Sequence, residues 1–313
     1  MENNQIFDSL LSDYQVRKSK KQKLRFISFI HEKCIDLGMT CRVEEKRGLV
    51  KNRNIVVGDV EKARVIFTAH YDTCAWMPVP NFITPKNIFF FVLYQFLLFG
   101  AIAFICLGIA FLATLFISKE FLLPIYNILF FVVLLQMLVG FPNKHTANDN
   151  TSGVATLLSL MQNIPTAERD KVAFVFFDNE ELGLIGSSMF KKLHKKIIAN
   201  KLLINFDCVS DGDHFLFVSR KRASNSEEFP LLKSIIEEEA PLFNKNSEFS
   251  NALRAFFPSD QIIYSKSIGV VALKKSSVLG LYLDRLHTSK DTRFDKNNLD
   301  FLTSSFTKFI LQI

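Results

Sequence analysis

Two long stretches without a charged residue constrain the fold of this 313-residue chain more than any other feature. Asn87–Ser118 holds 32 uncharged residues in succession, and Phe121–Asn143 holds 23 more after a two-residue interruption. Of the 33 phenylalanines, 12 lie between Ile88 and Phe141. A membrane-spanning helix needs about 20 apolar residues, because the hydrocarbon core is about 30 Å thick. Each stretch is therefore long enough to span a bilayer.

These stretches favour a helical transmembrane hairpin, with spans over residues 88–117 and 121–141. A buried helix of a globular protein seldom stays apolar on every face for so long. A hydrophobic lid or a dimer arm is the alternative. The hairpin, residues 87–141, then interrupts a single soluble domain that comprises residues 1–86 and 142–313. That domain is long enough to bury a substantial core.

The composition agrees with a soluble body that carries a membrane segment. Hydrophobic residues make up 49% of the chain and charged residues 22%, which excludes a disordered chain. The five cysteines are odd in number and form no C-x-x-C pair. Neither a disulfide framework nor a thiolate zinc site is therefore expected, and a reducing compartment is the simpler interpretation. The polar first 23 residues lack the apolar core of a signal peptide.

A basic run lies near the start of the chain. Six of the nine residues of Arg17–Arg25 are lysine or arginine, and none is acidic. No zinc knuckle or recognition-helix pattern accompanies the run, so nucleic acid is not an expected partner. A solvent-exposed helix face is the simplest interpretation. A helix that lies over anionic lipid headgroups is the alternative, and the nearby apolar stretches strengthen it.

Outside the apolar stretches, short β-branched or aromatic runs alternate with amphipathic stretches. This alternation predicts an α/β fold with a mostly parallel sheet flanked by helices. The expected strands are Asn54–Val57, Arg64–Thr68, Val172–Phe177, Leu202–Asp207, Gly269–Leu273 and Leu279–Leu283. The expected helices are Arg17–Leu37, Gly153–Asn163, Gly186–His194, Ser226–Ala240 and Asn298–Leu311.

Histidines and carboxylates follow several of the expected strands in order. They lie in the segments AHYDT (69–73), NDNTSG (148–153), DNEELG (178–183) and LHTSKDT (286–292), and at Asp207. Open α/β sheets bind ligands beyond the carboxyl ends of their strands, so these segments are expected to converge. A single aspartate after a strand is usually an ordinary surface residue. An ordered set of five such segments indicates a functional site.

Two histidines and three carboxylates in such a set suit a pair of divalent ions, with zinc favoured by the imidazoles. Two metals about 3.5–4 Å apart need a ligand that touches both, which a carboxylate can do. The pair lowers the pKa of a bridging water to about 7 and so supplies hydroxide at neutral pH. A further carboxylate that is not a ligand can move the proton. The neighbours Glu180 and Glu181 can divide these two tasks.

The segments AHYDT, NDNTSGVATLL, FVFFDNEELGLIGS and LHTSKDT resemble metallopeptidase family 28, the co-catalytic zinc aminopeptidases of the aminopeptidase Y and bacterial leucyl aminopeptidase type. The resemblance covers residues 45–86 and 142–313. It implies a zinc exopeptidase fold, which is phosphorylase/hydrolase-like, and a pair of Zn²⁺ ions. Mn²⁺ and Co²⁺ are the alternative native metals.

By this resemblance, five residues are expected to hold the two ions: His70, Asp149, Glu181, Asp207 and His287. Asp149 would bridge, with His70 and Asp207 on one ion and Glu181 and His287 on the other. The resemblance makes Glu180 the general base. It places Asp72 behind the first ion, where it would orient the His70 ring.

The sequence also departs from the pattern of the family. Ser259-Asp260 resembles a further family Ser-Asp pair, with Gln261 where histidine is common, and a helix cap is the equal alternative. Some members carry a tyrosine just before this pair that stabilises the transition state. Phe256 and Phe257 lie there instead. That stabilisation is then left to the metals or to another donor.

The leading functional prediction is a membrane-anchored, zinc-dependent aminopeptidase that removes N-terminal residues from peptides. Its partners would be the peptide substrate and the lipid bilayer, and no oligomeric state is predicted. A glutaminyl-cyclase-like acyltransferase, which shares the fold but uses one zinc, is one alternative. A catalytically silent membrane receptor or scaffold is the other, and the complete set of five ligands counts against it.

The expected site also predicts the topology of the chain in the membrane. His70 precedes the apolar stretches and Asp149 follows them, so both ends of the hairpin must emerge on one side and the number of spans must be even. Lys86, Lys144 and the basic run flank the soluble body, and positive residues near spans stay in the cytoplasm. A two-span protein with a cytoplasmic catalytic domain is expected.

Overall fold

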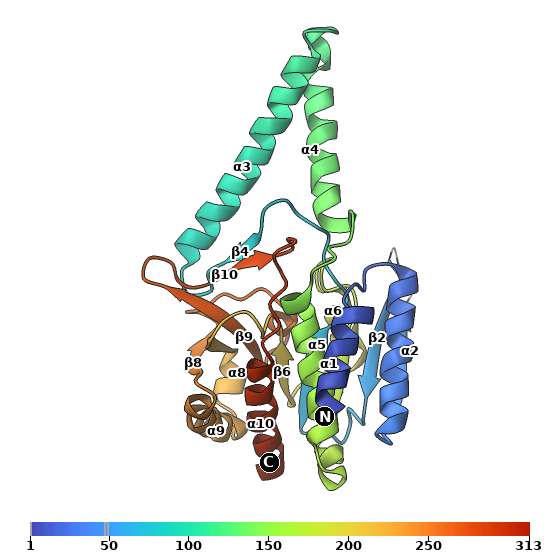
Figure 1. Cartoon of the computed structure of the whole chain (residues 1–313), viewed down its shortest axis with the longest axis vertical. Coiled ribbons are helices and arrows are strands. Elements are labelled where there is room, and N and C mark those ends of the chain that lie inside the picture. The colour runs from blue at the N-terminus through green and yellow to red at the C-terminus, as the bar shows by residue number, and fades with distance from the viewer. Residues whose placement is uncertain (1, 47, 49) are drawn as a thin grey trace.

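A mixed sheet with helices on both faces forms the body of the protein, and two long helices project from one end of it (Figure 1). The computed structural model describes residues 2–46, 48 and 50–313. The predicted α/β fold with an inserted pair of apolar helices is confirmed. Parallel pairing holds in the centre of the sheet, and antiparallel strands extend it on both sides.

The described residues form ten strands. These are β1 (Cys41–Lys46), β2 (Asn52–Val57), β3 (Val65–His70), β4 (Asn81–Ile83), β5 (Val172–Phe177), β6 (Leu202–Phe206), β7 (His214–Ser219), β8 (Asn246–Asn251), β9 (Ser267–Ser276) and β10 (Gly280–Leu286).

The longer helices of the described chain are α1 (Glu2–Asp13), α2 (Lys20–Asp36), α3 (Ile88–Ala113), α4 (Leu122–Val139), α5 (Gly153–Asn163), α6 (Ile185–Leu193), α9 (Glu228–Leu242) and α10 (Lys296–Gln312). Short helical segments are η1 (Lys119–Phe121), η2 (Ala147–Ser152), η3 (Thr166–Lys171), α7 (Lys195–Ile198), α8 (Lys221–Ser224) and η4 (Asp260–Ile263).

The strand order brings the polar segments of the sequence together. The sheet runs β1-β2-β5-β3-β6-β9-β10-β4, and β7 pairs with β9 and β8. The central strands β5, β3, β6 and β9 are parallel, so their carboxyl ends lie along the same edge. The segments that follow β3, β5 and β6 therefore meet at this edge, where open α/β sheets bind their ligands.

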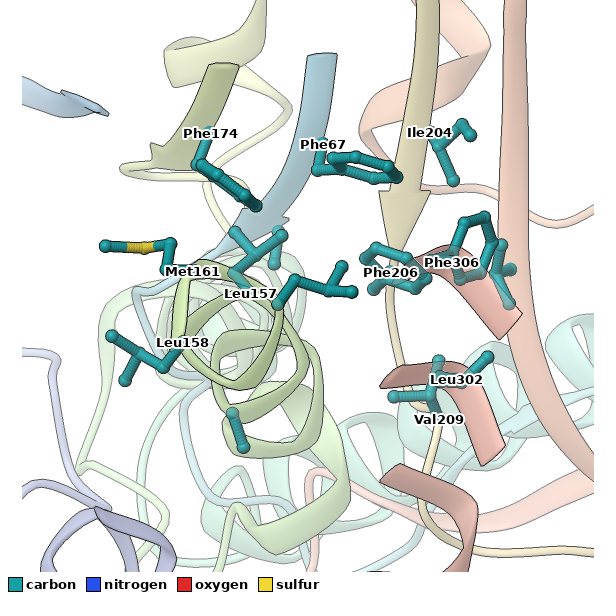
Figure 2. Packing of buried hydrophobic residues seen from close by; sticks show 14 of the residues in the cluster. Phe67, Leu157, Leu158, Met161, Phe174, Ile204, Phe206, Val209, Leu302 and Phe306 are labelled. Atoms are coloured by element: carbon teal, nitrogen blue, oxygen red, sulfur yellow. The ribbon is translucent and has the colours of Figure 1, made fainter. Parts of the chain in front are cut away.

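Aromatic side chains fill the space between the central strands and the helices α5 and α10 (Figure 2). Phe67 of β3 stacks on Phe174 of β5 and Phe206 of β6, with ring centroids 5.8 and 6.0 Å away. Phe306 of α10 meets Phe206 edge-on at 5.0 Å, and Leu157 of α5 lies against the same core. Stacked and edge-on aromatic pairs of this kind stabilise the core beyond the burial of apolar area. The core thus fixes the strands whose ends carry the site.

Two side chains of the basic run, those of Arg17 and Lys23, are buried in the body, so the expected solvent-exposed helix face is wrong for these two. Helix α2 begins at Lys20 because Ser19 caps it: the Ser19 hydroxyl accepts the Gln22 N–H, and the Gln22 side chain accepts the Ser19 N–H. Arg17 therefore precedes the helix and is fully buried, while Lys23 is only 8% exposed.

The two projecting helices, α3 and α4, are long and apolar enough to cross a membrane. Their large apolar side chains are mostly exposed, as at Phe104 (78%) and Phe131 (65%). They pack against each other and are joined by η1, and Figure 1 shows both rising from the same end of the body.

The strands that sequence reasoning missed are β1, β4, β7 and β8. The edge strands β1 and β8 carry mostly polar residues that stay at least partly exposed, so no apolar run marks them. The short strand β4 pairs only with β10, at the foot of the projecting helices. Pairing with neighbouring strands, rather than a local sequence pattern, makes β1, β4 and β8 strands.

Candidate metal centre

Most of the expected site residues lie at or just after the carboxyl ends of strands. His70 is the last residue of β3, and Asp207 directly follows β6. Glu180 and Glu181 lie in the loop after β5. Asp149 in η2 and His287 after β10 come from outside the parallel strands and reach the same place.

The first cluster contains His70, Asp149 and Asp207. Their potential ligand atoms lie within 4.8 Å of one another. The His70 Nε2 is 3.4 Å from the Asp149 Oδ1 and 3.5 Å from the Asp207 Oδ1. All three side chains are buried. One nitrogen and two carboxylate oxygens at these separations can surround one divalent ion.

The second cluster uses the other oxygen of Asp149. The His287 Nε2 lies 3.2 Å from the Asp149 Oδ2 and 3.4 Å from the Glu181 Oε2. Asp149 thus presents one oxygen to each histidine. A carboxylate held between two ligand sets in this way is suited to bridge a pair of ions.

The segment around Asp149 is held in place by its neighbours in NDNTSG. The Asn150 Oδ1 accepts the Gly153 N–H at 2.9 Å, and the Asn150 Nδ2 donates to the Phe206 carbonyl at 2.9 Å. Helix α5 begins so close to β6 that a Cβ atom on Gly153 would lie 2.4 Å from that same carbonyl oxygen. Glycine is therefore required at 153, and the close approach brings Asp149 next to Asp207.

Asp72 and Asp291 hold the backbone that carries the ligands. The Asp72 carboxylate accepts the N–H of Glu180 at 2.9 Å and that of Glu181 at 3.3 Å. The His70 Nδ1 lies 3.1 Å from the Asp72 backbone carbonyl and 3.7 Å from its carboxylate. Asp72 therefore lies where it can orient the ring, chiefly through its carbonyl oxygen.

Asp291 acts on the bridging residue in the same manner. Its two carboxylate oxygens accept the backbone N–H groups of Asn148 and Asp149, at 2.8 and 3.0 Å. Sequence reasoning gave Asp291 no role, although it lies in the LHTSKDT segment. Its signal is its position four residues after His287.

The donor set is suited to zinc. The Glu181 Oε1 and the Asp207 Oδ1 are buried and have no hydrogen-bond partner among the described residues. A buried carboxylate oxygen without a donor is unfavourable unless a cation is close. Imidazole nitrogens and carboxylate oxygens are ligands that zinc accepts.

The buried charges shift the pKa values of the ligands. Burial opposes protonation of His287, but the Glu181 and Asp149 carboxylates outweigh it and raise the His287 pKa to about 9. Burial raises the pKa of Glu181 to about 7. Asp149, although buried, has a lowered pKa because His287 and His70 stabilise its charge. Protons on His287 and Glu181 therefore compete with any metal ion that these ligands bind.

Glu180 lies with His70 and Glu181 in a third group whose donor atoms are within 4.8 Å of one another. Burial raises the pKa of Glu180 well above its usual value, and the charge of Asp260 adds to the shift. A carboxyl with a raised pKa is suited to proton transfer near neutral pH.

Asp260 is fully buried, and its negative charge helps to raise the pKa of Glu180. Burial raises its own pKa to about 7. The helix-cap alternative is not formed, because Ser259 makes no capping hydrogen bond to η4 and accepts one from the Asn205 side chain at 2.9 Å. Asp260 therefore belongs with the acidic residues that surround the candidate base.

Cys74 and Arg17 are two neighbours of the site that sequence reasoning did not assign. The Cys74 thiol lies within 4.8 Å of donor atoms of the second cluster, and burial raises its pKa. The fully buried Arg17 donates from Nη1 to the Thr151 hydroxyl at 3.1 Å, and burial lowers its pKa to about 10. Its position in the basic run is the one signal that the sequence offered.

The fold and these clusters define an α/β protein of the zinc exopeptidase and glutaminyl cyclase class. The structure resembles Porphyromonas gingivalis glutaminyl cyclase with a TM-score of 0.62 and 13% identity, covering 99% of this chain and 96% of that one. It resembles a Zn-dependent exopeptidase from Parabacteroides distasonis with a TM-score of 0.62 and 15% identity, over 98% and 96% of the chains. For the Legionella pneumophila LapA aminopeptidase the TM-score is 0.58 and the identity 13%, over 99% and 70%. At identities this low, the structural similarity shows a shared fold alone.

The chain belongs to peptidase family M28, whose model matches residues 137–306, more than half of the sequence. The resemblance found in the sequence is thereby confirmed. Among curated proteins, none matches the chain. Membership of this family supports a hydrolase that acts on peptides, and the neighbours that share the fold include a Zn-dependent exopeptidase and a glutaminyl cyclase.

Proposed function

We propose that the protein is a membrane-anchored, zinc-dependent aminopeptidase that removes N-terminal residues from peptides. The position of Asp149 carries the proposal. Its two carboxylate oxygens lie 3.4 Å from the His70 Nε2 and 3.2 Å from the His287 Nε2. A pair of ions held by such a carboxylate is suited to hydrolysis of an amide.

In this proposal His70, Asp149 and Asp207 hold one zinc ion, and Asp149, Glu181 and His287 hold the other. When bound, two zinc ions lower the pKa of a water molecule and polarise the substrate carbonyl. Glu180 takes the proton of the attacking water and passes it to the leaving amine. Its raised pKa supports that role.

The hairpin of residues 87–141 is proposed to anchor the peptidase domain of residues 1–86 and 142–313 in the membrane, with the site on the cytoplasmic side. Contacts at the base of the hairpin join it to the peptidase domain. Ala75 pairs with Pro142, the Trp76 N–H donates to the Phe141 carbonyl at 2.8 Å, and the Asn143 side chain donates to the Thr288 carbonyl at 2.9 Å. The base of the hairpin therefore lies beside the segment that carries His287.

A glutaminyl-cyclase-like activity is the second candidate, because a glutaminyl cyclase is among the structural neighbours. The first cluster favours the peptidase. His70 completes a ligand set with Asp149 and Asp207, and the set of Glu181 and His287 shares Asp149 with it. A single-zinc enzyme needs one of these sets and not both.

The deciding experiment uses the full-length protein in detergent. Its zinc content is measured by elemental analysis, and its action on a peptide library is followed by mass spectrometry. We expect about two zinc ions per chain, stepwise loss of N-terminal residues, and resistance of N-acetylated peptides. Loss of ammonia from N-terminal glutamine with one zinc ion would indicate the cyclase. No reaction and no zinc would indicate a scaffold.

A further inference from the structure

A cavity of about 280 Å³ opens beside the candidate metal centre. Asp72 and Glu181 line it on the side of the centre. Lys18, Lys20 and Lys51 line it elsewhere, and Val139 at the end of α4 borders it too. The cavity thus connects the reaction site with a basic wall at the foot of the projecting helices. A space of this size suits part of a small ligand rather than a folded partner.

Some of the positive charges in this wall are neutralised within the protein. Lys51 pairs with Glu45 at 2.7 Å. Two deeper basic residues of the wall, Lys23 and Arg53, pair with Asp178 at 2.5 Å and with Glu45 at 2.9 Å. These side chains are therefore not the free cations of the cavity.

Two lysines of the wall, Lys18 and Lys20, have no ion pair to a carboxylate among the described residues. Lys20 is exposed, whereas Lys18 is only partly exposed. Its Nζ donates to the Leu138 carbonyl at 3.2 Å, which uses one of its three donors. Burial lowers its pKa, which the charges of Glu181 and Asp72 partly oppose. An ammonium that faces a cavity with two free donors favours an anionic ligand.

The geometry of the proposed reaction identifies the anion. A peptide bound with its N-terminal residue at the metal centre must extend away from that centre. An extended chain advances about 3.3–3.6 Å per residue, so two or three residues cover roughly 7–11 Å. A free carboxylate at the end of such a peptide is the anion that this cavity can meet. The carboxylate of a long peptide lies beyond it.

We propose that Lys18, with Lys20 beside it, binds the C-terminal carboxylate of the substrate and makes the enzyme selective for dipeptides and tripeptides. This inference rests on the proposed aminopeptidase function and names its substrate class. The α2 sequence agrees with it, since the first turn carries lysines and no acidic residue, the reverse of the usual preference.

The test compares one apolar tripeptide as its free acid and as its C-terminal amide, with full-length protein in phosphatidylcholine vesicles. Lys18→Gln removes the charge but keeps a donor for the Leu138 carbonyl. A charged hydrogen bond contributes about 1.5–3 kcal/mol, so KM for the acid should rise about tenfold or more in Lys18→Gln. KM for the amide should already be raised in the wild type and should not change further. Lys21→Gln, exposed on α2 and outside the cavity, is the matched control.

Equal effects of Lys18→Gln on acid and amide, or no effect on either, would overturn the subsite while leaving the aminopeptidase assignment intact. A protein that hydrolyses none of the peptides would overturn that assignment and the subsite with it. A second arm replaces part of the lipid by phosphatidylglycerol. If this lipid inhibits the wild type but not Lys18→Gln, and the acid holds no advantage over the amide, the cavity binds lipid headgroups instead.

Discussion

The carboxylate of Asp72 accepts the backbone N–H of Glu180 at 2.9 Å. Through this bond, the end of β3 fixes the loop that follows β5, although more than a hundred residues separate the two along the chain. The Asp72 backbone carbonyl also lies 3.1 Å from the His70 Nδ1. One residue therefore positions a candidate ligand and the candidate base at once.

Replacement of Asp72 by asparagine should impair the positioning of these residues without preventing folding. The backbone carbonyl toward His70 remains, but one of the two carboxylate acceptors for the Glu180 and Glu181 amides becomes an NH₂ donor. Changes in residues that support metal ligands typically lower activity or metal affinity by about 10–100-fold, and a loss of that size is expected. Asp59→Asn is the control, because Asp59 accepts two backbone amides at an exposed turn away from the site. Equal losses in both variants would contradict a positioning role for Asp72.

Glu180→Gln should abolish most turnover without loss of metal. Glutamine keeps the size and hydrogen-bonding capacity of the side chain but cannot carry the proton. General acid–base groups contribute about 10²–10⁴-fold, so kcat should fall by that factor while zinc content stays unchanged. The measurement is steady-state kinetics with elemental analysis of the same sample, and the exposed Glu227→Gln serves as control. Near-normal turnover in Glu180→Gln would exclude it as the base.

Metal content should distinguish the bridging ligand from a ligand of one ion. Asp149 belongs to both clusters, whereas Asp207 belongs to the first alone. Asp207→Asn should therefore lower the zinc content towards half of the wild-type value. Asp149→Asn should remove most of it and lower the melting temperature further, since metal binding free energy is also folding free energy. The same content in both variants would argue against a bridge.

The elements that the sequence predicted best are those with a strong apolar pattern. The strand Val172–Phe177 and the helix Gly153–Asn163 form with the predicted bounds. The clustering of the candidate ligands was foreseeable for a related reason: several of them follow buried strands, and parallel strands bring their ends together. His70 and Asp207 needed no more than this argument and the family pattern.

Long-range contacts account for what the sequence did not reveal. Arg17 looked like one more charge of a basic helix, but the Ser19 cap places it before the helix, and its side chain donates to the Tyr71 carbonyl and the Thr151 hydroxyl in the interior. The polar strand Asn246–Asn251 exists because β7 pairs with it. Asp260 is marked by its Ser-Asp pair and Asp291 by its place in the LHTSKDT segment, but neither mark says what the carboxylate contacts. Each gains its role from burial against residues distant in the chain.

The metal-free protein should become less stable as pH rises from about 5 to 9. The pKa of His287 is raised to about 9 in the folded state, so the folded protein holds a proton that the unfolded chain releases near pH 6.5. Glu181, with its pKa raised to about 7, holds another between about pH 4.5 and 7. Where the native state binds more protons, the free energy of unfolding falls with rising pH.

Thermal denaturation of chelator-treated protein at pH 6 and pH 9 checks this expectation. The His287→Asn variant, also metal-free, should lose the part of the decrease that lies above pH 6.5. Zinc-loaded protein should show a smaller decrease or an increase, because the ions compete with these protons. A metal-free protein that grows more stable between pH 6 and 9 would contradict the coupling of these charges.

The topology prediction follows from the meeting of His70, before the hairpin, with Asp149, after it. The His70 Nε2 and the Asp149 Oδ1 lie 3.4 Å apart, so if α3 and α4 cross a membrane, both ends of the hairpin must emerge on the same side of it. Lys86 and Lys144 flank the two helices on the side of the body, while the far loop carries Lys119 next to Glu120. The positive-inside rule then predicts a cytoplasmic body.

Cysteines introduced at Ser118, in the far loop, and at Asn225, on the exposed surface of the body, report the two sides. A membrane-impermeant maleimide applied to intact cells should label Ser118→Cys and should label Asn225→Cys only after permeabilisation. The unmodified protein is the control for its five native cysteines, four of which are buried and the fifth, Cys41, partly so. The reverse pattern would put the metal centre outside the cell. Labelling of both positions only after permeabilisation would show that α3 and α4 do not cross the membrane.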